Sequence, residues 1–241
     1  MNNHYLYLVI NIATVIFPLL FSFEKRVAYY RSWRSLLPSL LMTAALFIFW
    51  DRFFTLEGIW GFNPAYITGY TVFGLPVEEV MFFFTIPYAS IFIYSFLNTF
   101  YPQATFFDRY AGKIILGILA VSVLGLVFYY DHTYTALNCA YAIILLALQQ
   151  FLVKGAYMGR FYRFYCWHLI PFFIVNGILT GSGIAGEVVW YQPDSITGLR
   201  LVTIPVEDTL YSMSLMLMNI MLFEYLQSRV KHRSLSVTLS K

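Results

Sequence analysis

The chain has 241 residues, of which 60% are hydrophobic and 11% are charged, and its formal net charge at pH 7 is +3. A soluble domain carries roughly 25% charged residues. The composition therefore excludes an ordinary soluble enzyme, predicts a multi-span membrane protein within a lipid bilayer, and gives no reason to expect a nucleic-acid partner.

Seven apolar segments are long enough, or nearly so, to cross a bilayer, which takes about 20 helical residues. They cover residues 5–23, 35–50, 71–97, 114–130, 133–153, 164–182 and 200–224. If the N-terminus is placed outside, thirteen of the fifteen Lys and Arg residues fall in inside segments, and only Arg52 and Arg200 fall outside. Because Lys and Arg concentrate in cytoplasmic loops, we expect a multi-pass protein of the cell membrane with its N-terminus outside and its C-terminus in the cytoplasm.

A short acidic motif occurs twice in the chain. The stretch Pro76-Val77-Glu78-Glu79 returns 129 residues later as Pro205-Val206-Glu207-Asp208. The residues before each copy also match at the same offset: residues 64–69 and 193–198 share a Pro, an Ile, a Thr and a Gly in the same order. An internal duplication of this kind predicts a site that is built from two halves.

The odd number of segments determines how the two halves relate. Segments one to three correspond to segments five to seven, and the fourth segment returns the chain to its starting side, so the repeats are parallel. We therefore expect an all-α polytopic membrane protein of seven transmembrane helices, arranged as two parallel three-helix repeats about a twofold axis along the membrane normal. The first repeat would cover residues 1–100, the connector 101–132, the second repeat 133–228, and a cytoplasmic basic tail 229–241.

Each motif places two adjacent carboxyl groups in an apolar segment, where a charge costs about 2.5–3.5 kcal/mol and is usually functional. Because residues 70–75 are also apolar, Glu78 is expected about seven residues inside its helix, ~10 Å along the axis. The alternative is an ordinary helix start with acidic residues in its first turn, where the helix dipole favours them.

Adjacent helical residues point about 100° apart, so only one acid of each motif is expected to face the other repeat. Glu78 and Glu207 are identical in the two copies, whereas Glu79 is replaced by Asp208. We therefore expect Glu78 and Glu207 to be the reacting pair. Two carboxyl groups that are held close in a low dielectric do not both ionise, so one of them keeps a proton and is available as an acid.

Aromatic residues next to the motifs are candidate substrate-binding residues, because aromatic faces stabilise a bound cation. The competing interpretation is packing in the core or against lipid. These aromatic candidates are Trp60, Trp190, Phe82, Phe83 and Tyr211. The residues expected to support the motifs are Pro76, Pro205, Thr68 and Thr197. The four histidines have no metal-site spacing, so we expect no metal.

The duplicated Pro-x-Glu-(Glu/Asp) motifs and the residues that precede them resemble the lycopene cyclase domain of the carotenoid pathway, over residues 1–228. The resemblance implies a lycopene β-cyclase, an isomerase that acts as an intramolecular lyase without cofactor. A terminal double bond of lycopene would be protonated, the cation would close a ring, and a lost proton would leave a β end group. The family's essential acids would be Glu78 and Glu207, together with Glu79 and Asp208. Lycopene or a related linear carotenoid is the expected substrate, and other carotenoid-pathway enzymes are candidate partners.

Several other functions remain open from the sequence. A sibling cyclase would form ε or γ rings or act on C50 carotenoids, and the sequence does not place the base that decides the ring type. A proton-coupled transporter also uses acids within spans and repeated halves, although residues 114–182 offer few polar side chains for a transport path. If the chain is a sensor or assembly protein, a change of Glu78 should cause no loss of a product.

Overall fold

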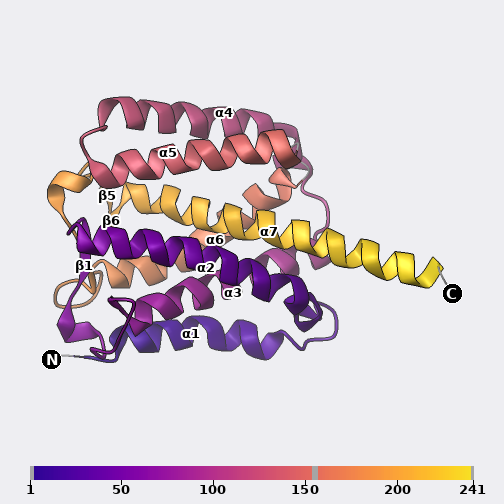
Figure 1. Ribbon diagram of the computed structural model, residues 1–241, viewed down its shortest axis with the longest axis horizontal. Helices are drawn as coiled ribbons and strands as arrows, with labels where there is room; N and C mark the ends of the chain where they lie inside the picture. The colour runs from indigo at the N-terminus through magenta and orange to yellow at the C-terminus, as the bar shows by residue number, and fades with distance from the viewer. Residues whose placement is uncertain (1–2, 154–156, 240–241) are drawn as a thin grey trace.

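The computed structural model describes residues 3–153 and 157–239, which contain seven α-helices (Figure 1). The helices are α1 (Leu6–Phe21), α2 (Trp33–Leu56), α3 (Val77–Phe100), α4 (Thr105–Phe128), α5 (Thr133–Leu148), α6 (Met158–Leu179) and α7 (Val206–Leu239). The helical fold class is thus confirmed. The predicted tail, 229–241, continues α7 as far as Leu239, and its last two residues lie outside the described ranges.

Five helical segments in the described ranges are long and apolar enough to cross a membrane. They are Tyr29–Leu56, Val77–Phe100, Thr105–Phe128, Thr133–Phe151 and Val206–Val230. The helix α1 is a shorter apolar helix, and α6, which corresponds to the predicted segment 164–182, is not one of the five. These helices indicate a membrane protein.

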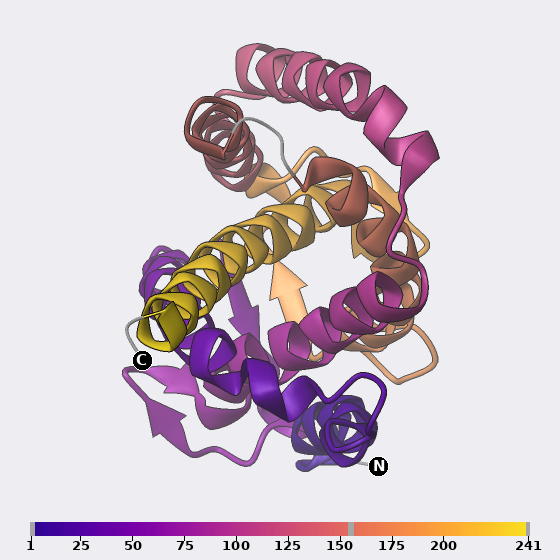
Figure 2. The same cartoon turned by 90° about the vertical axis from the view of Figure 1, so that its right-hand side faces the viewer.

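The helices of the two repeats are interleaved. α3 packs against α1 and α2 of its own half and against α6 of the other half, while α7 packs against α5 and α2. α4 lies at the periphery, where it packs against α5 and α6 (Figure 2). The central core is rich in aromatic side chains; the ring of Phe47 on α2, for example, contacts those of Phe83 and Tyr211. The two acidic motifs therefore begin helices that belong to one packed body.

A tight hairpin precedes each acidic motif. β2 (Thr71–Val72) pairs with β3 (Leu75–Pro76), and β5 (Arg200–Leu201) pairs with β6 (Ile204–Pro205). In the first hairpin, φ is +54° at Phe73 and +80° at Gly74, the combination that a two-residue type I′ turn requires. The prediction that residues 71–76 and 200–205 belong to membrane helices is therefore wrong.

The hairpins change the depth of the acids. α3 begins at Val77 and α7 at Val206, so all four motif acids lie in the first turn of a helix. The prediction that Glu78 lies about seven residues inside its helix is wrong, because the apolar residues before it form the hairpin. Acidic side chains in a first turn lie in the favourable field of the helix dipole, as the alternative interpretation expected.

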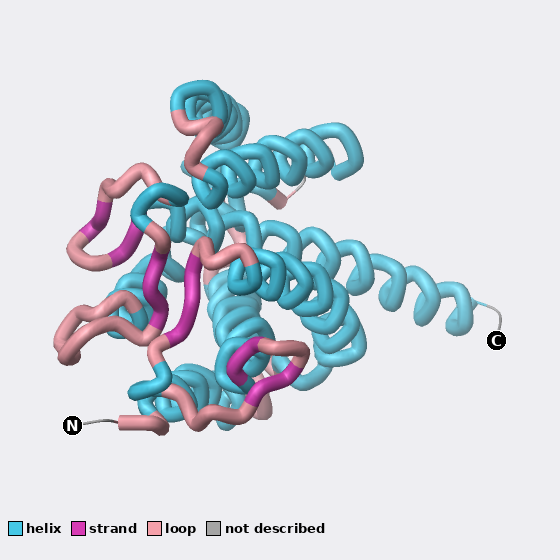
Figure 3. The backbone as a smooth tube through the Cα atoms, turned by 60° about the vertical axis from the view of Figure 1, so that its left-hand side comes forward, coloured by secondary structure: helices cyan, strands magenta, loops and turns pink. Residues whose placement is uncertain are grey.

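One strand from each repeat joins the two halves. β1 (Trp60–Phe62) pairs antiparallel with β4 (Val189–Tyr191), with Gly61 opposite Trp190. A Cβ atom on Gly61 would lie 2.3 Å from the Trp190 ring, so only glycine fits there. Because matched segments of the repeats pair with each other, this contact is self-complementary in the manner of a twofold interface. The strands gather at one end of the helices, the end at which the acidic motifs lie (Figure 3).

Candidate active site

The second acids of the two motifs line one cavity. Glu79 on α3 and Asp208 on α7 border a space of about 70 Å³, and their exposed fractions are only 7% and 4%. We call this space the acid pocket. Its aromatic lining residues are Tyr7, Trp60, Phe62, Phe82, Tyr134, Phe172, Tyr191 and Tyr211. The pocket thus combines one carboxyl group from each repeat with a largely aromatic wall.

A tyrosine from the first helix of each repeat binds the second acid. The hydroxyl of Tyr7 donates to Oε2 of Glu79 at 2.5 Å, and the hydroxyl of Tyr134 donates to Oδ1 of Asp208 at 2.7 Å. Tyr7 and Tyr134 lie 127 residues apart near the starts of α1 and α5. The same contact is therefore built twice from repeated sequence.

The two second acids differ in their remaining contacts. Oδ2 of Asp208 accepts from Nδ2 of Asn176 and from the hydroxyl of Tyr191, each at 2.8 Å. Asp208 therefore accepts three side-chain hydrogen bonds, whereas Tyr7 supplies the hydrogen bond that Glu79 accepts within the described ranges. Donors around a carboxylate stabilise its negative charge, so the duplicated site is not electrostatically symmetric.

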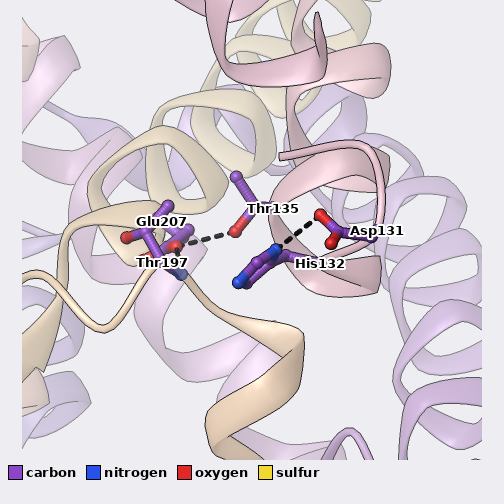
Figure 4. A network of polar contacts seen from close by, with 5 residues as sticks. All are labelled: Asp131, His132, Thr135, Thr197 and Glu207. Atoms are coloured by element: carbon purple, nitrogen blue, oxygen red, sulfur yellow. Dashed lines mark hydrogen bonds and ion pairs between the residues drawn. The ribbon is translucent and has the colours of Figure 1, made fainter. Parts of the chain in front are cut away.

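The first acids of the motifs bind the loops that precede them. Oε1 of Glu78 accepts from the backbone N–H of Thr68 at 2.8 Å. Oε1 of Glu207 accepts from the backbone N–H of Thr197 at 2.6 Å and from the hydroxyl of Thr135 at 2.7 Å (Figure 4). Neither carboxyl group lines the acid pocket. Glu207 instead borders a separate, largely apolar cavity of about 840 Å³ among α4, α5, α6 and α7.

The helix starts are also fixed by two matched asparagines. Nδ2 of Asn11 donates to the backbone oxygen of Glu78 at 3.1 Å, and Nδ2 of Asn138 donates to that of Glu207 at 2.7 Å. Each asparagine lies one helical turn after the tyrosine that binds the second acid. The repeated pattern Tyr-x-x-x-Asn was a signal in the sequence, but its 127-residue offset differs from that of the acidic motif, and the sequence analysis missed it.

The predicted aromatic residues divide into two groups. Trp60, Phe82 and Tyr211 line the acid pocket. Phe83 is 1% exposed and packs in the central core, and Trp190 packs over the strand β1. Aromatic character next to a motif therefore did not distinguish pocket residues from packing residues.

The four predicted supporting residues act through the backbone. Pro76 and Pro205 end the strands β3 and β6, directly before the two helices. Thr68 and Thr197 donate their backbone N–H groups to the first acids. The structure thus brings these four residues to the two helix starts, and none of them lines the acid pocket. For the described ranges, no cluster of three or more His, Cys, Asp and Glu residues could hold a metal ion.

Comparison with known proteins places the duplicated site in a family. A family model described as "Lycopene cyclase" matches residues 4–97 and 131–226. The chain is 47% identical over 49 residues to a lycopene beta-cyclase of Halobacterium salinarum, which is 20% of this chain and 19% of that protein. It is 24% identical over 130 residues to a bifunctional lycopene cyclase/phytoene synthase of Aspergillus oryzae, which is 51% of this chain and 22% of that protein.

The aligned segments span about a fifth of the length of these curated relatives. No solved structure matches the chain significantly. The two segments matched by the family model, by contrast, cover most of the chain, and each holds one acidic motif with its tyrosine and asparagine. This protein therefore belongs to the lycopene cyclase family.

Proposed function

We propose that the protein is a lycopene β-cyclase, and that the acid pocket is where the ends of lycopene close into β-ionone rings. One carboxylic acid in the pocket transfers its proton to the terminal double bond. The neighbouring alkene attacks the resulting tertiary cation and forms the ring bond, and a carboxylate then takes a ring proton as the new double bond forms. The proton gained equals the proton lost, so the reaction is an isomerisation that needs no redox cofactor.

The observation that carries this proposal is the pairing of Glu79 with Asp208 in one buried pocket. No Lys, Arg or His is among the described residues that line it. A carbocation that forms in the pocket would therefore be surrounded by carboxyl groups and aromatic faces, both of which stabilise cations. The β ring is proposed from the printed name of the Halobacterium relative.

The membrane arrangement is part of the same proposal. We infer that all seven helices cross the membrane as two parallel repeats, residues 1–100 and 133–228, joined by 101–132, with the N-terminus outside. The self-complementary pairing of β1 with β4 supports a twofold relation between the repeats. A substrate that is dissolved in the bilayer would then reach the acid pocket from between the helices.

An apolar cavity adjoins the acid pocket. It measures about 480 Å³, lies among α1, α3 and α6, and shares Phe82, Ile86, Phe172 and Asn176 with the acid pocket. We call it the side cavity. Its remaining lining is mostly apolar, and the polar residues in it are Thr14, Ser90 and His168. The side cavity suits the hydrocarbon chain of a linear carotenoid, whose end would enter the acid pocket.

Filling the side cavity is expected to weaken substrate binding without disturbing the carboxyl groups. Ala13 is an exposed residue that lines the cavity on α1, so Ala13→Phe places a ring in it at little cost to packing. We expect the KM for lycopene to rise about tenfold or more, which corresponds to about 1.4 kcal/mol of lost binding. Ala120→Phe, at an exposed position of α4 outside the cavity, is the matched control. Equal kinetics for both variants would remove the side cavity from the substrate path.

Expression in a lycopene-accumulating bacterium tests the proposed function directly. We expect β-carotene or the one-ring product γ-carotene to replace lycopene, as measured by chromatography of the extracted pigments. In deuterated water the product rings should gain solvent deuterium, because the first step adds a proton from a carboxylic acid that exchanges with water. Unchanged lycopene at a confirmed level of membrane-inserted protein would reject the activity, and an unlabelled cyclic product would reject the protonation step.

A further inference from the structure

Each hairpin that precedes an acidic motif exposes an apolar residue in its turn. Phe73 is 73% exposed and Val202 is 91% exposed, and the two positions match at the 129-residue offset of the acidic motifs. We call these two residues the hairpin tips. Their neighbours Val72 and Leu201 are exposed as well. A single exposed apolar side chain is ordinary, but the same exposure at matched positions of both repeats needs a common explanation.

The backbone makes the hairpin tips unfavourable positions for large apolar side chains. φ is +54° at Phe73 and +62° at Val202, in the left-handed region where bulky and β-branched residues are rare. Two-residue hairpin turns favour glycine, asparagine or aspartate where φ is positive. Neither the turn nor contact with water therefore explains the two residues, whereas a contact with an apolar partner outside the chain explains both.

An exposed arginine lies against each turn. The guanidinium of Arg52, near the end of α2, donates to the backbone oxygen of Phe73, and that of Arg200, on β5, donates to the backbone oxygen of Thr203 at 2.6 Å. Among the described residues, no carboxylate lies within 4.0 Å of either guanidinium. These arginines occupy unmatched positions of the two repeats, and they are the two basic residues that the proposed topology places outside. Each hairpin thus combines an apolar tip with a cation that has further N–H groups to donate to an anion.

Exposed tyrosines lie at the same end of the helices. Tyr70 begins the first hairpin, and Tyr130 lies in the loop between α4 and α5, at the end where β5 and β6 lie (Figure 1). Tyrosine is enriched where a membrane protein crosses from lipid to water. The backbone oxygen of Tyr70 also accepts from the N–H of Val77, and that of Leu199 accepts from the N–H of Val206. Each hairpin is therefore bonded to the first residue of its motif helix, at an end that suits a membrane surface.

We infer, on the basis of the proposed membrane arrangement, that both hairpins dock on the lipid bilayer. Phe73 and Val202 insert among the lipid chains just below the headgroups, and Arg52 and Arg200 bind lipid phosphate groups, as interfacial segments with apolar and basic side chains do. A lipid surface fits tips that share apolar character but differ in shape, whereas a protein partner would distinguish Phe from Val. Because each hairpin is bonded to its motif helix, the two contacts hold both helix starts, and with them the acid pocket, at a fixed depth.

Spin labels on the full-length protein, reconstituted in vesicles of phosphatidylcholine and phosphatidylglycerol, test the inference. In a background with Cys139→Ala and Cys166→Ala, the variants Val72→Cys and Leu201→Cys carry a label beside each intact tip. We expect both labels to collide several-fold more often with lipid-soluble oxygen than with a water-soluble nickel chelate. Asp194→Cys, in an exposed loop before β5, is the control for a label in water. Leu116→Cys, at an exposed position of α4, is the control for a label in lipid.

Replacing the tips shows whether they cause the insertion. Phe73→Ser combined with Val202→Ser should raise the nickel collisions of both labels several-fold, whereas Phe73→Leu combined with Val202→Leu should leave them low. Equal collisions in the two forms would show that the helices alone set the depth, and would overturn the inference.

The controls separate this inference from the proposals on which it depends. Hairpin labels that behave like the Asp194 label, while the Leu116 label stays in lipid, would overturn the docking and leave the membrane arrangement intact. A Leu116 label in water would overturn both. Spectral broadening between hairpin labels of two molecules would identify a second copy of the chain as the partner instead of lipid. The collision rates do not depend on turnover, so an inactive wild type would count against the proposed function alone.

Discussion

The variants Glu79→Gln and Asp208→Asn are each expected to lower the rate of lycopene cyclisation by about 10²–10⁴-fold, the usual contribution of a positioned acid or base. Both carboxyl groups line the acid pocket, and an amide neither donates a carboxylic proton nor accepts one from the ring cation. The measurement is the initial rate of pigment conversion in membranes that contain equal amounts of each variant. Amides of nearly the same shape keep the packing of the pocket, so the loss reports chemistry.

Glu78→Gln and Glu207→Gln are the matched controls for this prediction. The amide oxygen of Gln still accepts from the backbone N–H groups of Thr68 and Thr197, so these variants should keep most of the wild-type rate. If instead Glu78→Gln and Glu207→Gln are inactive while Glu79→Gln and Asp208→Asn are active, the first acids are the reacting pair, as the sequence analysis expected.

The sequence predicted the helices well but placed the beginnings of α3 and α7 too early. Long apolar segments identified all seven helices, because burial in lipid or in the core requires continuous apolar residues. The same reasoning assigned residues 71–76 and 200–205 to helices, since a short apolar run does not distinguish a strand from a helix. Gly74 was the one turn signal in the first hairpin, and the second hairpin has no glycine in its turn. Because the hairpins end at Pro76 and Pro205, the helices begin only at the next residue, and the acids lie in the first helical turn.

The identity of Glu78 with Glu207 was informative about structure. Both residues accept the backbone N–H of a loop residue ten positions earlier, and this shared demand explains why the same residue occupies both copies. The second position differs between the copies, Glu79 against Asp208, where the surrounding groups also differ.

The largest expected effect on stability comes from replacing Glu207 with Leu. This change leaves the N–H of Thr197 and the hydroxyl of Thr135 without their acceptor, whereas Glu78→Leu leaves only the N–H of Thr68. A buried donor without a partner costs about 1–3 kcal/mol, so the free energy of unfolding should fall by about 1–3 kcal/mol more for Glu207→Leu than for Glu78→Leu. Denaturant unfolding of the purified protein in detergent micelles measures both.

The difference between the two leucine variants isolates one contact. Each variant also removes a carboxylate oxygen that has no hydrogen-bond partner, and the effect of this loss cancels in the comparison. The position that matches Thr135 in the first repeat is Leu8, which has no hydroxyl to lose. In a Thr135→Val background, Glu207→Leu should therefore cost no more than Glu78→Leu. If the two leucine variants are equally stable with Thr135 present, the hydroxyl contributes nothing to holding the second helix start. The first acids would then fix their loops through the backbone N–H groups alone, in the same way in both repeats.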